Sequence, residues 1–511
     1  MTLDPARPQA EALAVRDGRI VAVGSFDGTA AEVVDVGDAC VLPGFVEAHG
    51  HFVGDAVVQG GGIVDIRPVT VPTAGEVVEL VRATVARRGA AYFNGWDALL
   101  QKGLPEPTTE WLDSVAPDTP LVIMHNSGHS VYFNSVAARR AGLTRDTPDP
   151  LGGHFGRTGD GELDGSAYEQ PATSMILQPL LAEVVAPGIV EAFAAGSARA
   201  NAAGVTMMSE MGFGPGFRPA LAAARAAGAI TLRLRLYEVL GGTPDPGEGD
   251  DLIRQIGVKM WADGSPWIGN LAASFPYLDT AATRALGLEP GHRAATNYTA
   301  DQLLELSAGH FAEGRQLACH ANGDEAVELV LDAWERLPRH TRPDHRLRME
   351  HCSAMRPEQF ARAHALGITC SLFPDHLYYW GEVLADDLFG AEVADRWAPV
   401  GTAMRTGMRV SLHNDSPVTP VEPLRNIAVA ATRLSRRGRR YGAHEAIGVE
   451  QAIRAQTIDA AYQLFADDIA GSLEPGKYAD LVVLESDPRE VPPEEIGDLR
   501  VLATFLAGSQ V

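Results

Sequence analysis

Residues 40–52 read CVLPGFVEAHGHF, a short apolar run that ends at two histidines, His49 and His51. The run has the length and composition of a buried β-strand. Side chains two positions apart on a strand point to the same face, so both imidazoles can reach one metal ion. Imidazole nitrogen is a common ligand of zinc and related divalent metals. A lone His-x-His pair also fits a polar strand edge, so the rest of the chain must decide between the two interpretations.

Four further ligand-type residues stand in short apolar runs of the same kind. They are Lys259 in IGVKMWADG (256–264), His320 in QLACHANGD (316–324), His351 in LRMEHCS (347–353) and Asp415 in MRVSLHNDSPV (408–418). Helical-looking stretches rich in Ala, Leu and Arg separate these runs. Repeated strand–helix alternation indicates a parallel α/β fold, and in a (β/α)8 barrel functional groups gather at the C-terminal ends of the strands. We therefore predict a TIM-type barrel in which these residues meet at one mouth.

Lys259 is unusual because the chain holds only three lysines, the others being Lys102 and Lys477. A buried ammonium group is costly and tends to lose its proton. One alternative is a salt bridge, for example with Asp263. The other is a neutral amine that reacts with carbon dioxide and becomes a carbamate bridging two metals. Position in the sequence leaves both alternatives open.

In order and residue type, this set resembles the binuclear amidohydrolase superfamily. The segments KMWADGS, CHANGDEAV, RMEHCS and NDSPV are similar to its YtcJ-like branch, which includes N-substituted formamide deformylases, and PGFVEAHGHF and GSLEPGKYADLVVL extend the resemblance over nearly the whole chain. The resemblance implies that His49, His51 and Asp415 hold one divalent metal and that His320 and His351 hold a second, bridged by carbamylated Lys259. Zinc is the expected metal, and Mn2+ or Fe2+ also suits these ligands.

The activity implied by the resemblance is hydrolysis of a carbon–nitrogen amide bond in a small N-acyl compound or N-substituted formamide. A hydroxide shared by two metals would attack the carbonyl carbon, and Asp415 would serve as general base. Ester or lactone hydrolysis at the same site is one alternative, and a metal-binding scaffold with little turnover is another. Without the other ligands, Asp415 would be interpreted as a helix N-cap before Ser416 and Pro417.

The substrate pocket is less directly predicted. His125 and His129 in HNSGHS (125–130) are candidate catalytic and substrate-binding residues, because either could hydrogen-bond the developing oxyanion; ordering of the surrounding segment is the alternative. The other substrate-binding candidates are Trp96, Asp97, Trp267, Asn322, His376 and Tyr379. For the aromatic residues the alternative role is packing between helices, which is commoner, and Asn322 could simply terminate its strand.

The domain organisation is predicted to be discontinuous. Short strands with turn signals at both ends of the chain favour a composite β-sandwich built from residues 1–43 and 466–511. The barrel would span residues 44–465. Within it, residues 54–190 are too long for a simple βα loop and are rich in Gly and Pro, which indicates an inserted lid over the active site.

Composition excludes several functional classes. A formal net charge of −24 argues against a nucleic-acid partner, which requires a basic face. No run approaches the roughly 18 apolar residues of a membrane span, and the N-terminus lacks the pattern of a signal peptide. We therefore expect a cytoplasmic enzyme that acts on a small-molecule substrate. The expected protein partner is a second copy of the chain, in a homodimer. The basic run from Arg433 to Arg440 is predicted to be a solvated surface loop.

Overall fold

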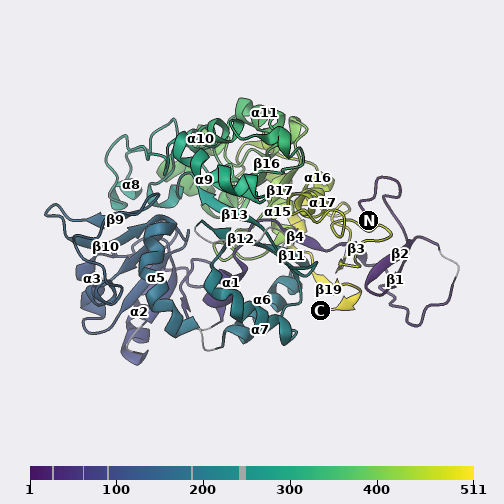
Figure 1. The fold of residues 1–511 in the computed structure, drawn as a ribbon, viewed down its shortest axis with the longest axis horizontal. Helices are drawn as coiled ribbons and strands as arrows, with labels where there is room; N and C mark the ends of the chain where they lie inside the picture. The colour runs from purple at the N-terminus through teal and green to yellow at the C-terminus, as the bar shows by residue number, and fades with distance from the viewer. Residues whose placement is uncertain (26–27, 61, 89–90, 186–187, 241–248) are drawn as a thin grey trace.

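The computed structural model describes residues 1–25, 28–60, 62–88, 91–185, 188–240 and 249–511. An eight-stranded sheet forms its centre (Figure 1), and every neighbouring pair of strands is parallel. In sheet order the strands are β4 (Phe45–Glu47), β11 (Val205–Phe213), β12 (Arg233–Val239), β13 (Ile253–Trp261), β14 (Gln316–Ala321), β15 (Arg348–His351), β16 (Thr369–Leu372) and β17 (Val410–Leu412).

The sheet curls until its two edges nearly meet. Just beyond the edge strands β4 and β17, the backbone N–H of His51 donates to the carbonyl oxygen of Ser416 at 2.7 Å. The N–H of Asn414 likewise donates to Oε1 of Glu47 at 2.8 Å. The predicted (β/α)8 barrel is therefore confirmed, and it brings the first and last of the predicted metal ligands to the same seam.

Strands and helices of the barrel follow the usual burial patterns. β11 reads VTMMSEMGF and is buried at eight of its nine positions, as expected of a parallel strand covered on both faces. The helices that follow the strands are α7 (Arg218–Ala226), α9 (Ala300–Ala312), α10 (Asp324–Glu335), α11 (Pro357–Ala365), α14 (Val400–Arg405), α15 (Pro423–Thr432), α16 (Val449–Ala455) and α17 (Ile458–Gln463). In α10 the buried residues Val327, Val330, Leu331 and Trp334 repeat at helical spacing, so one face packs on the sheet.

A separate six-stranded sheet lies between the first and second barrel strands in sequence. Its order is β5 (Val64–Asp65), β6 (Ala91–Trp96), β7 (Leu121–His125), β8 (Ser130–Phe133), β10 (Leu163–Tyr168) and β9 (His154–Arg157). The helices of this region are α1 (Phe52–Gln59), α2 (Ala74–Arg88), α3 (Thr109–Val115), α4 (Ser135–Arg140), α5 (Glu169–Val185) and α6 (Ile189–Ala202). The inserted sheet occupies one end of the long axis of the molecule (Figure 1).

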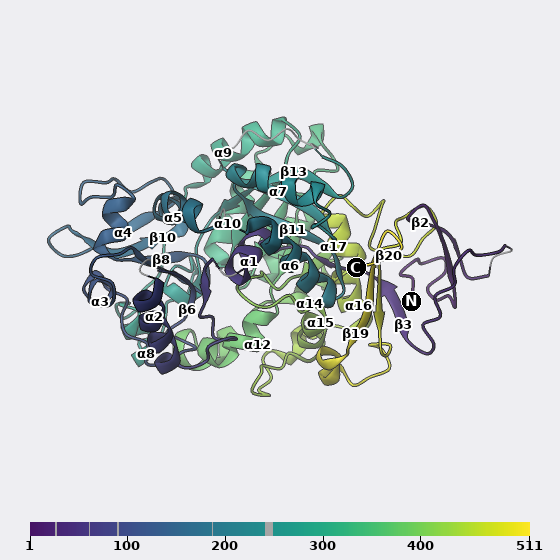
Figure 2. The same cartoon turned by 90° about the horizontal axis from the view of Figure 1, so that it is seen from below.

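The two chain termini build the opposite end, as Figures 1 and 2 both show. A four-stranded sheet runs β3 (Cys40–Pro43), β18 (Leu481–Leu484), β19 (Val501–Leu506) and β20 (Ser509–Gln510), and β3 pairs antiparallel with β18. A hairpin of β1 (Leu13–Arg16) and β2 (Arg19–Val23) packs Ile20 and Val23 against Ala479 and Leu481. The flanking sandwich is thus confirmed, while its boundaries at residues 43 and 466 and the 54–190 limits of the insertion remain predictions.

Three smaller helices lie near the mouth of the barrel. They are α8 (Ala281–Ala285), α12 (Asp375–Glu382), which continues into a π-helical turn, and α13 (Ala391–Ala394). Around them Trp267, Trp380 and Trp397 form an aromatic cluster with Tyr277 and Phe389. Helix α12 carries a residue of this cluster and lies directly after barrel strand β16, so the cluster borders the mouth of the barrel.

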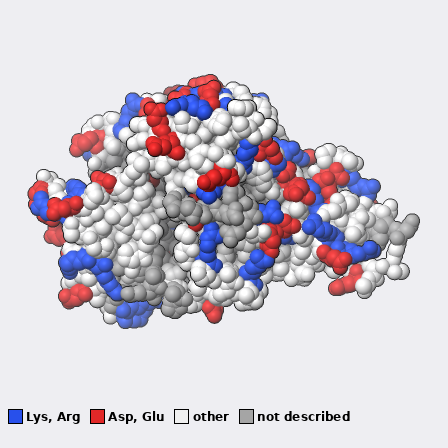
Figure 3. All heavy atoms as spheres, viewed as in Figure 1, with Lys and Arg blue, Asp and Glu red and all other residues white. Residues whose placement is uncertain are grey.

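Two surface features complete the description. On the face seen in Figure 3, acidic and basic side chains are interspersed over the described part of the chain. No helix among the described residues combines the length and hydropathy needed to cross a membrane. Arg433, predicted to be solvated, is instead 1% exposed, and its guanidinium donates to the carbonyl oxygens of Trp397, Ala398 and Tyr441. The prediction failed there because three inward-facing carbonyl groups replace water around the charge.

Candidate metal centre

The six predicted metal ligands converge at the C-terminal ends of the barrel strands. Lys259, His320 and His351 belong to β13, β14 and β15, and the other three follow β4 and β17 closely. Five of the six are less than a tenth exposed, and only the His51 side chain reaches 28% exposure. Residues scattered from position 49 to position 415 therefore share one largely buried site, as the barrel topology predicts.

The tightest group is formed by His49, His51 and Asp415. Their potential ligand atoms all lie within 4.8 Å of one another. Oδ1 of Asp415 is 3.4 Å from Nε2 of His49 and 3.4 Å from Nε2 of His51. Burial alone would raise the pKa of Asp415, but the two imidazoles outweigh it and hold the pKa well below its usual range. The carboxylate is consequently ionised and points at two imidazole nitrogens.

The backbone is strained at two of these positions. Asp415 has φ 55° and His351 has φ 70°, and Cys352, which follows His351, has φ 50°. Residues with a Cβ atom are uncommon in this left-handed region, and such conformations gather at functional sites. No helix begins at Asp415, since α15 starts at Pro423, so the N-cap alternative is not seen.

Lys259 is 1% exposed and points toward the same group. Its Nζ lies 3.3 Å from Nε2 of His49, and burial lowers its pKa to about 8. Among the described residues Lys259 forms no ion pair with a carboxylate within 4.0 Å. Asp263, the partner considered from the sequence, instead accepts the backbone N–H groups of Asn322, Gly323 and Ala272. The salt-bridge alternative is therefore not seen.

A second group of histidines adjoins the first. His49, His351 and His413 also place ligand atoms within 4.8 Å of one another, and Nε2 of His413 lies 3.1 Å from Nδ1 of His351. The His320 ring is 4.5 Å from the His351 ring, centroid to centroid. Nε2 of His320 lies 3.0 Å from Nδ2 of Asn322, 3.3 Å from the carbonyl oxygen of Gly264 and 3.5 Å from the Asp263 carboxylate.

Comparison with known proteins agrees with this arrangement. Residues 32–511 match the model of the amidohydrolase family. The chain belongs to the amidohydrolase family.

Three similar proteins each align with nearly the whole chain. The chain is 29% identical to the protein LONG AFTER FAR-RED 3 of Arabidopsis thaliana over 100% of this chain and 90% of that protein. It is 29% identical to the N-substituted formamide deformylase of Arthrobacter pascens, covering 99% and 96% of the two chains. The YtcJ protein of Bacillus subtilis is 25% identical over 98% and 96%. The resemblance to the YtcJ-like branch is thereby confirmed.

The fold is shared with a solved structure. The crystal structure of an uncharacterized metal-dependent hydrolase from Pyrococcus horikoshii superposes with a TM-score of 0.68 at 21% identity, covering 94% of each chain. At 21% identity this similarity supports the fold alone, that is, the barrel and its flanking sandwich.

The amidohydrolase site fits a divalent metal on its own geometry. Oδ1 of Asp415 is buried and has no hydrogen-bond partner among the described residues, although the two nearest imidazole nitrogens lie only 3.4 Å away. An orphaned carboxylate oxygen between two imidazole nitrogens is the donor set that a metal such as zinc accepts. His49, His51 and Asp415 thus form a cluster able to bind a metal.

Residues behind the cluster fix the orientation of His49. Nδ1 of His49 lies 2.6 Å from Oε2 of Glu350, and Glu350 is held in turn by Nε and Nη2 of Arg348. The Glu350 carboxylate accepts a hydrogen bond from Nδ1–H, so Nε2 presents its lone pair to Asp415 and Lys259. Histidine ligands of metals commonly have such a carboxylate partner.

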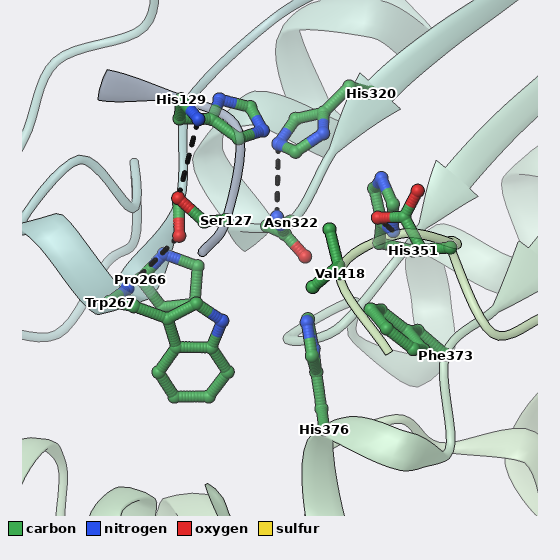
Figure 4. A pocket seen from close by; sticks show the side chains of 12 residues that line it. Ser127, His129, Pro266, Trp267, His320, Asn322, His351, Phe373, His376 and Val418 are labelled. Carbon is green, nitrogen blue, oxygen red and sulfur yellow. Dashed lines mark hydrogen bonds and ion pairs between the residues drawn. The ribbon is translucent and has the colours of Figure 1, made fainter. Parts of the chain in front are cut away.

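A pocket opens in front of the histidines (Figure 4), and its space not filled by atoms, the open solvent at its mouth included, is about 240 Å3. Its lining comes from the barrel and from the inserted segment. The lining residues are Ser127, His129, Ser265, Pro266, Trp267, His320, Asn322, His351, Phe373, His376, Asp415 and Val418. Of the substrate-binding candidates, the structure brings His129, Trp267, Asn322 and His376 together here.

Other candidates lie outside this lining. Trp96 packs against Trp111 inside the inserted sheet, and Tyr379 packs beside Trp380. Asp97 accepts the indole N–H of Trp380 at 3.1 Å, and Nδ1 of His125 accepts the backbone N–H of Ser127 at 3.0 Å. Their predicted contact with substrate stays a prediction.

Three charged or polar residues of the site were not predicted from the sequence. His413 stands two positions before Asp415, so strand alternation could have placed both on one face. Glu350 directly precedes His351, but its pairing with His49 depends on barrel closure. Glu169 accepts a hydrogen bond from Nδ1 of His129 at 2.8 Å, across a long stretch of chain that carries no local signal.

Proposed function

We propose that this protein hydrolyses the carbon–nitrogen bond of a small N-acyl compound of the N-substituted formamide type, with two divalent metals. The observation that carries the proposal is the buried Asp415 Oδ1, which lacks a hydrogen-bond partner and faces His49 and His51. The substrate class is supported by the similarity to the Arthrobacter deformylase, which extends over 99% of this chain.

In this proposal His49, His51 and Asp415 would hold one divalent metal, and His320 and His351 would hold a second. Lys259, as a carbamate, would supply a ligand to both, and burial lowers its pKa to about 8, which increases the share of the neutral amine that such a modification requires. Zinc is the preferred ion, with Mn2+ or Fe2+ as alternatives. Bound metals would supply a water molecule of lowered pKa and would polarise the substrate carbonyl.

The protein itself would position the substrate and move protons. Asp415 would accept a proton from the attacking water at its carboxylate and return it to the leaving nitrogen. His129, whose Nδ1 is held by Glu169, presents its other ring nitrogen on the pocket side and would contact the leaving group.

The test is turnover of a matched panel by protein purified without chelator. The panel holds N-alkyl and N-aryl formamides, the corresponding acetamides, formate esters and simple lactones. We expect about two divalent metal ions per chain by elemental analysis and fastest hydrolysis of formamides. Metal-free protein with full activity would overturn the metal proposal, and preferred ester or lactone turnover would overturn the proposed bond specificity.

A further inference from the structure

We infer that His376 donates a hydrogen bond from Nε2 to the carbonyl oxygen of the substrate, and that Trp397 fixes the ring tautomer that makes this possible. The inference rests on the proposed function, because it requires an acyl substrate in the pocket. It adds a substrate-contacting donor to a site whose other polar side chains are committed to the metal cluster or to each other.

His376 lies in the first turn of α12, close after the end of β16. It is 4% exposed and lines the pocket together with Phe373 and Val418. In Figure 4 its ring rises from the start of the helix into the space between Trp267, Val418 and Phe373. The ring therefore reaches the pocket from the side opposite to His129 and His320.

The hydrogen bonds behind the ring determine where its proton sits. Nε1 of Trp397 lies 3.3 Å from Nδ1 of His376, and an indole N–H can only donate. Nδ1 must therefore be the accepting, unprotonated nitrogen, and the hydrogen of the neutral ring must be on Nε2. Trp397 cannot easily turn away, because it is fully buried and stacks on Phe389 with ring centroids 5.6 Å apart.

The donor nitrogen itself faces open pocket. Among the described residues Nε2 of His376 has no hydrogen-bond partner, while Nδ1 has Trp397 and the nearby Ser353 hydroxyl at 3.2 Å. Burial lowers the pKa of His376 to about 3, so the ring stays neutral at physiological pH and remains a donor of one hydrogen. A donor aimed into a pocket selects a ligand that offers an acceptor at that point.

The chemistry of an amide identifies which substrate atom can accept this hydrogen bond. The nitrogen of an amide has no available lone pair, so the carbonyl oxygen is the acceptor that every N-acyl substrate offers. The His376 ring lies 6.4 Å from the His351 ring, so an acyl group placed against the histidine cluster has this donor within reach of its oxygen. Negative charge grows on that oxygen during attack, and a preorganised neutral donor then binds it more strongly.

The decisive variants separate the two ring nitrogens. His376→Gln places an amide N–H near the position of Nε2, whereas His376→Asn places its amide near Nδ1. We expect kcat/KM of His376→Asn to fall by roughly 10²–10³-fold, the usual loss for an oxyanion donor, and His376→Gln to recover at least a tenfold part of it. Metal content should be unchanged in both. His345→Gln, at a buried histidine outside the pocket, is the matched control and should retain wild-type kcat/KM.

Two further readouts do not depend on absolute activity. Nitrogen-15 NMR of histidine-labelled protein should show His376 protonated at Nε2 alone from pH 6 to 8, and Trp397→Phe should remove that preference. Replacing the scissile carbonyl oxygen of a formamide by sulfur, a poorer acceptor, should slow wild type more than His376→Asn.

The outcomes separate this inference from the proposed function. An Nδ1-protonated His376, equal loss in the Gln and Asn variants, or an identical sulfur effect in wild type and His376→Asn would overturn the inference while leaving the hydrolase intact. A metal-loaded wild type that turns over no acyl substrate would overturn the proposed function, and this inference with it.

Discussion

His49 depends on charged partners buried behind it. Glu350 accepts a hydrogen bond from its Nδ1–H and is itself paired with Arg348, and all three side chains are essentially inaccessible to water. The pKa of the Glu350 carboxyl lies well below its usual range, because the Arg348 charge and the hydrogen bonds from His49 and Arg348 outweigh the opposing effect of burial. Removing either partner leaves a buried charge without compensation.

Glu350→Gln should therefore weaken metal binding by about 10–100-fold, the usual cost of losing a partner behind a ligand. It should also lower the free energy of unfolding by about 3–5 kcal/mol, because Arg348 loses its carboxylate. The double variant Glu350→Gln/Arg348→Met should regain stability without regaining metal affinity. Metal titration and denaturant unfolding measure the two effects, and joint recovery of both would contradict the assigned role of Glu350.

Lys259 offers a test of the bridging carbamate. Lys259→Ala should lose most activity and part of its metal, and short carboxylic acids added to the protein should restore some of both. Lys259→Arg should remain inactive, because a guanidinium group cannot form the carbamate. Metal content and turnover are measured with and without added acid. An active Arg variant would show that Lys259 serves only as a positive charge.

Asp415→Asn separates general-base catalysis from metal binding. The amide retains one oxygen donor, so metal binding should survive in part, while kcat should fall by about 10²–10⁴-fold because the proton acceptor is lost. Metal analysis of the same preparation is the control. Near-normal turnover with both metals present would transfer the proton-accepting role to another group, of which His129 is the next candidate.

At the scale of elements, the inserted sheet is tied to the barrel through few polar contacts. Nη1 of Arg67, just beyond β5, donates to the carbonyl oxygen of Pro417 at 2.7 Å, two residues after Asp415. Asp97, beyond β6, accepts the indole N–H of Trp380 in α12. These contacts join the insertion to the loop that carries Asp415 and to helix α12, which carries His376. They were not predictable, because sequence patterns place each strand locally and do not say which loops will meet.

The link through Asp97 predicts a pH dependence of stability. Burial raises the pKa of Asp97 to about 6 from its ordinary value of 3.8, so the folded state holds this proton more tightly than the unfolded state. Stability of the wild type should fall as pH rises from about 4 to about 6 and then level off. Denaturant unfolding of wild type and Asp97→Asn should show a difference that grows across this window by up to about 3 kcal/mol. A difference independent of pH would contradict the shifted pKa.

For the whole molecule, the order of strands and the position of the site were predictable from the sequence. The contacts between segments distant in sequence were not. Apolar runs ending at His49, His320 and His351 predicted both the barrel and the mouth where they meet. The terminal sandwich followed from turn-punctuated strands at both chain ends. Arg433 and the His129–Glu169 pair escaped prediction, since burial of a charge depends on carbonyl groups and carboxylates supplied by distant segments.

Metal removal should affect the stability of the entire chain. Any ion bound by the folded state alone adds stability that grows with the logarithm of its concentration over Kd. Chelator-treated protein should therefore unfold at a lower temperature than metal-loaded protein, and added zinc should restore the original Tm. Calorimetry at several zinc concentrations measures this, with His345→Gln as a variant expected to respond like wild type. A Tm independent of zinc would contradict a metal held by the folded state.

The seam between the first and last barrel strands has a consequence for biosynthesis. His49 and His51 leave the ribosome early, whereas Asp415 emerges only after all eight barrel strands have been made, and the two edges meet through His51 and Ser416. Contacts so far apart in sequence form late in folding. We expect nascent chains that lack β17 to capture no metal at the His49–His51 pair with native affinity, so that metal loading follows the completion of the barrel strands.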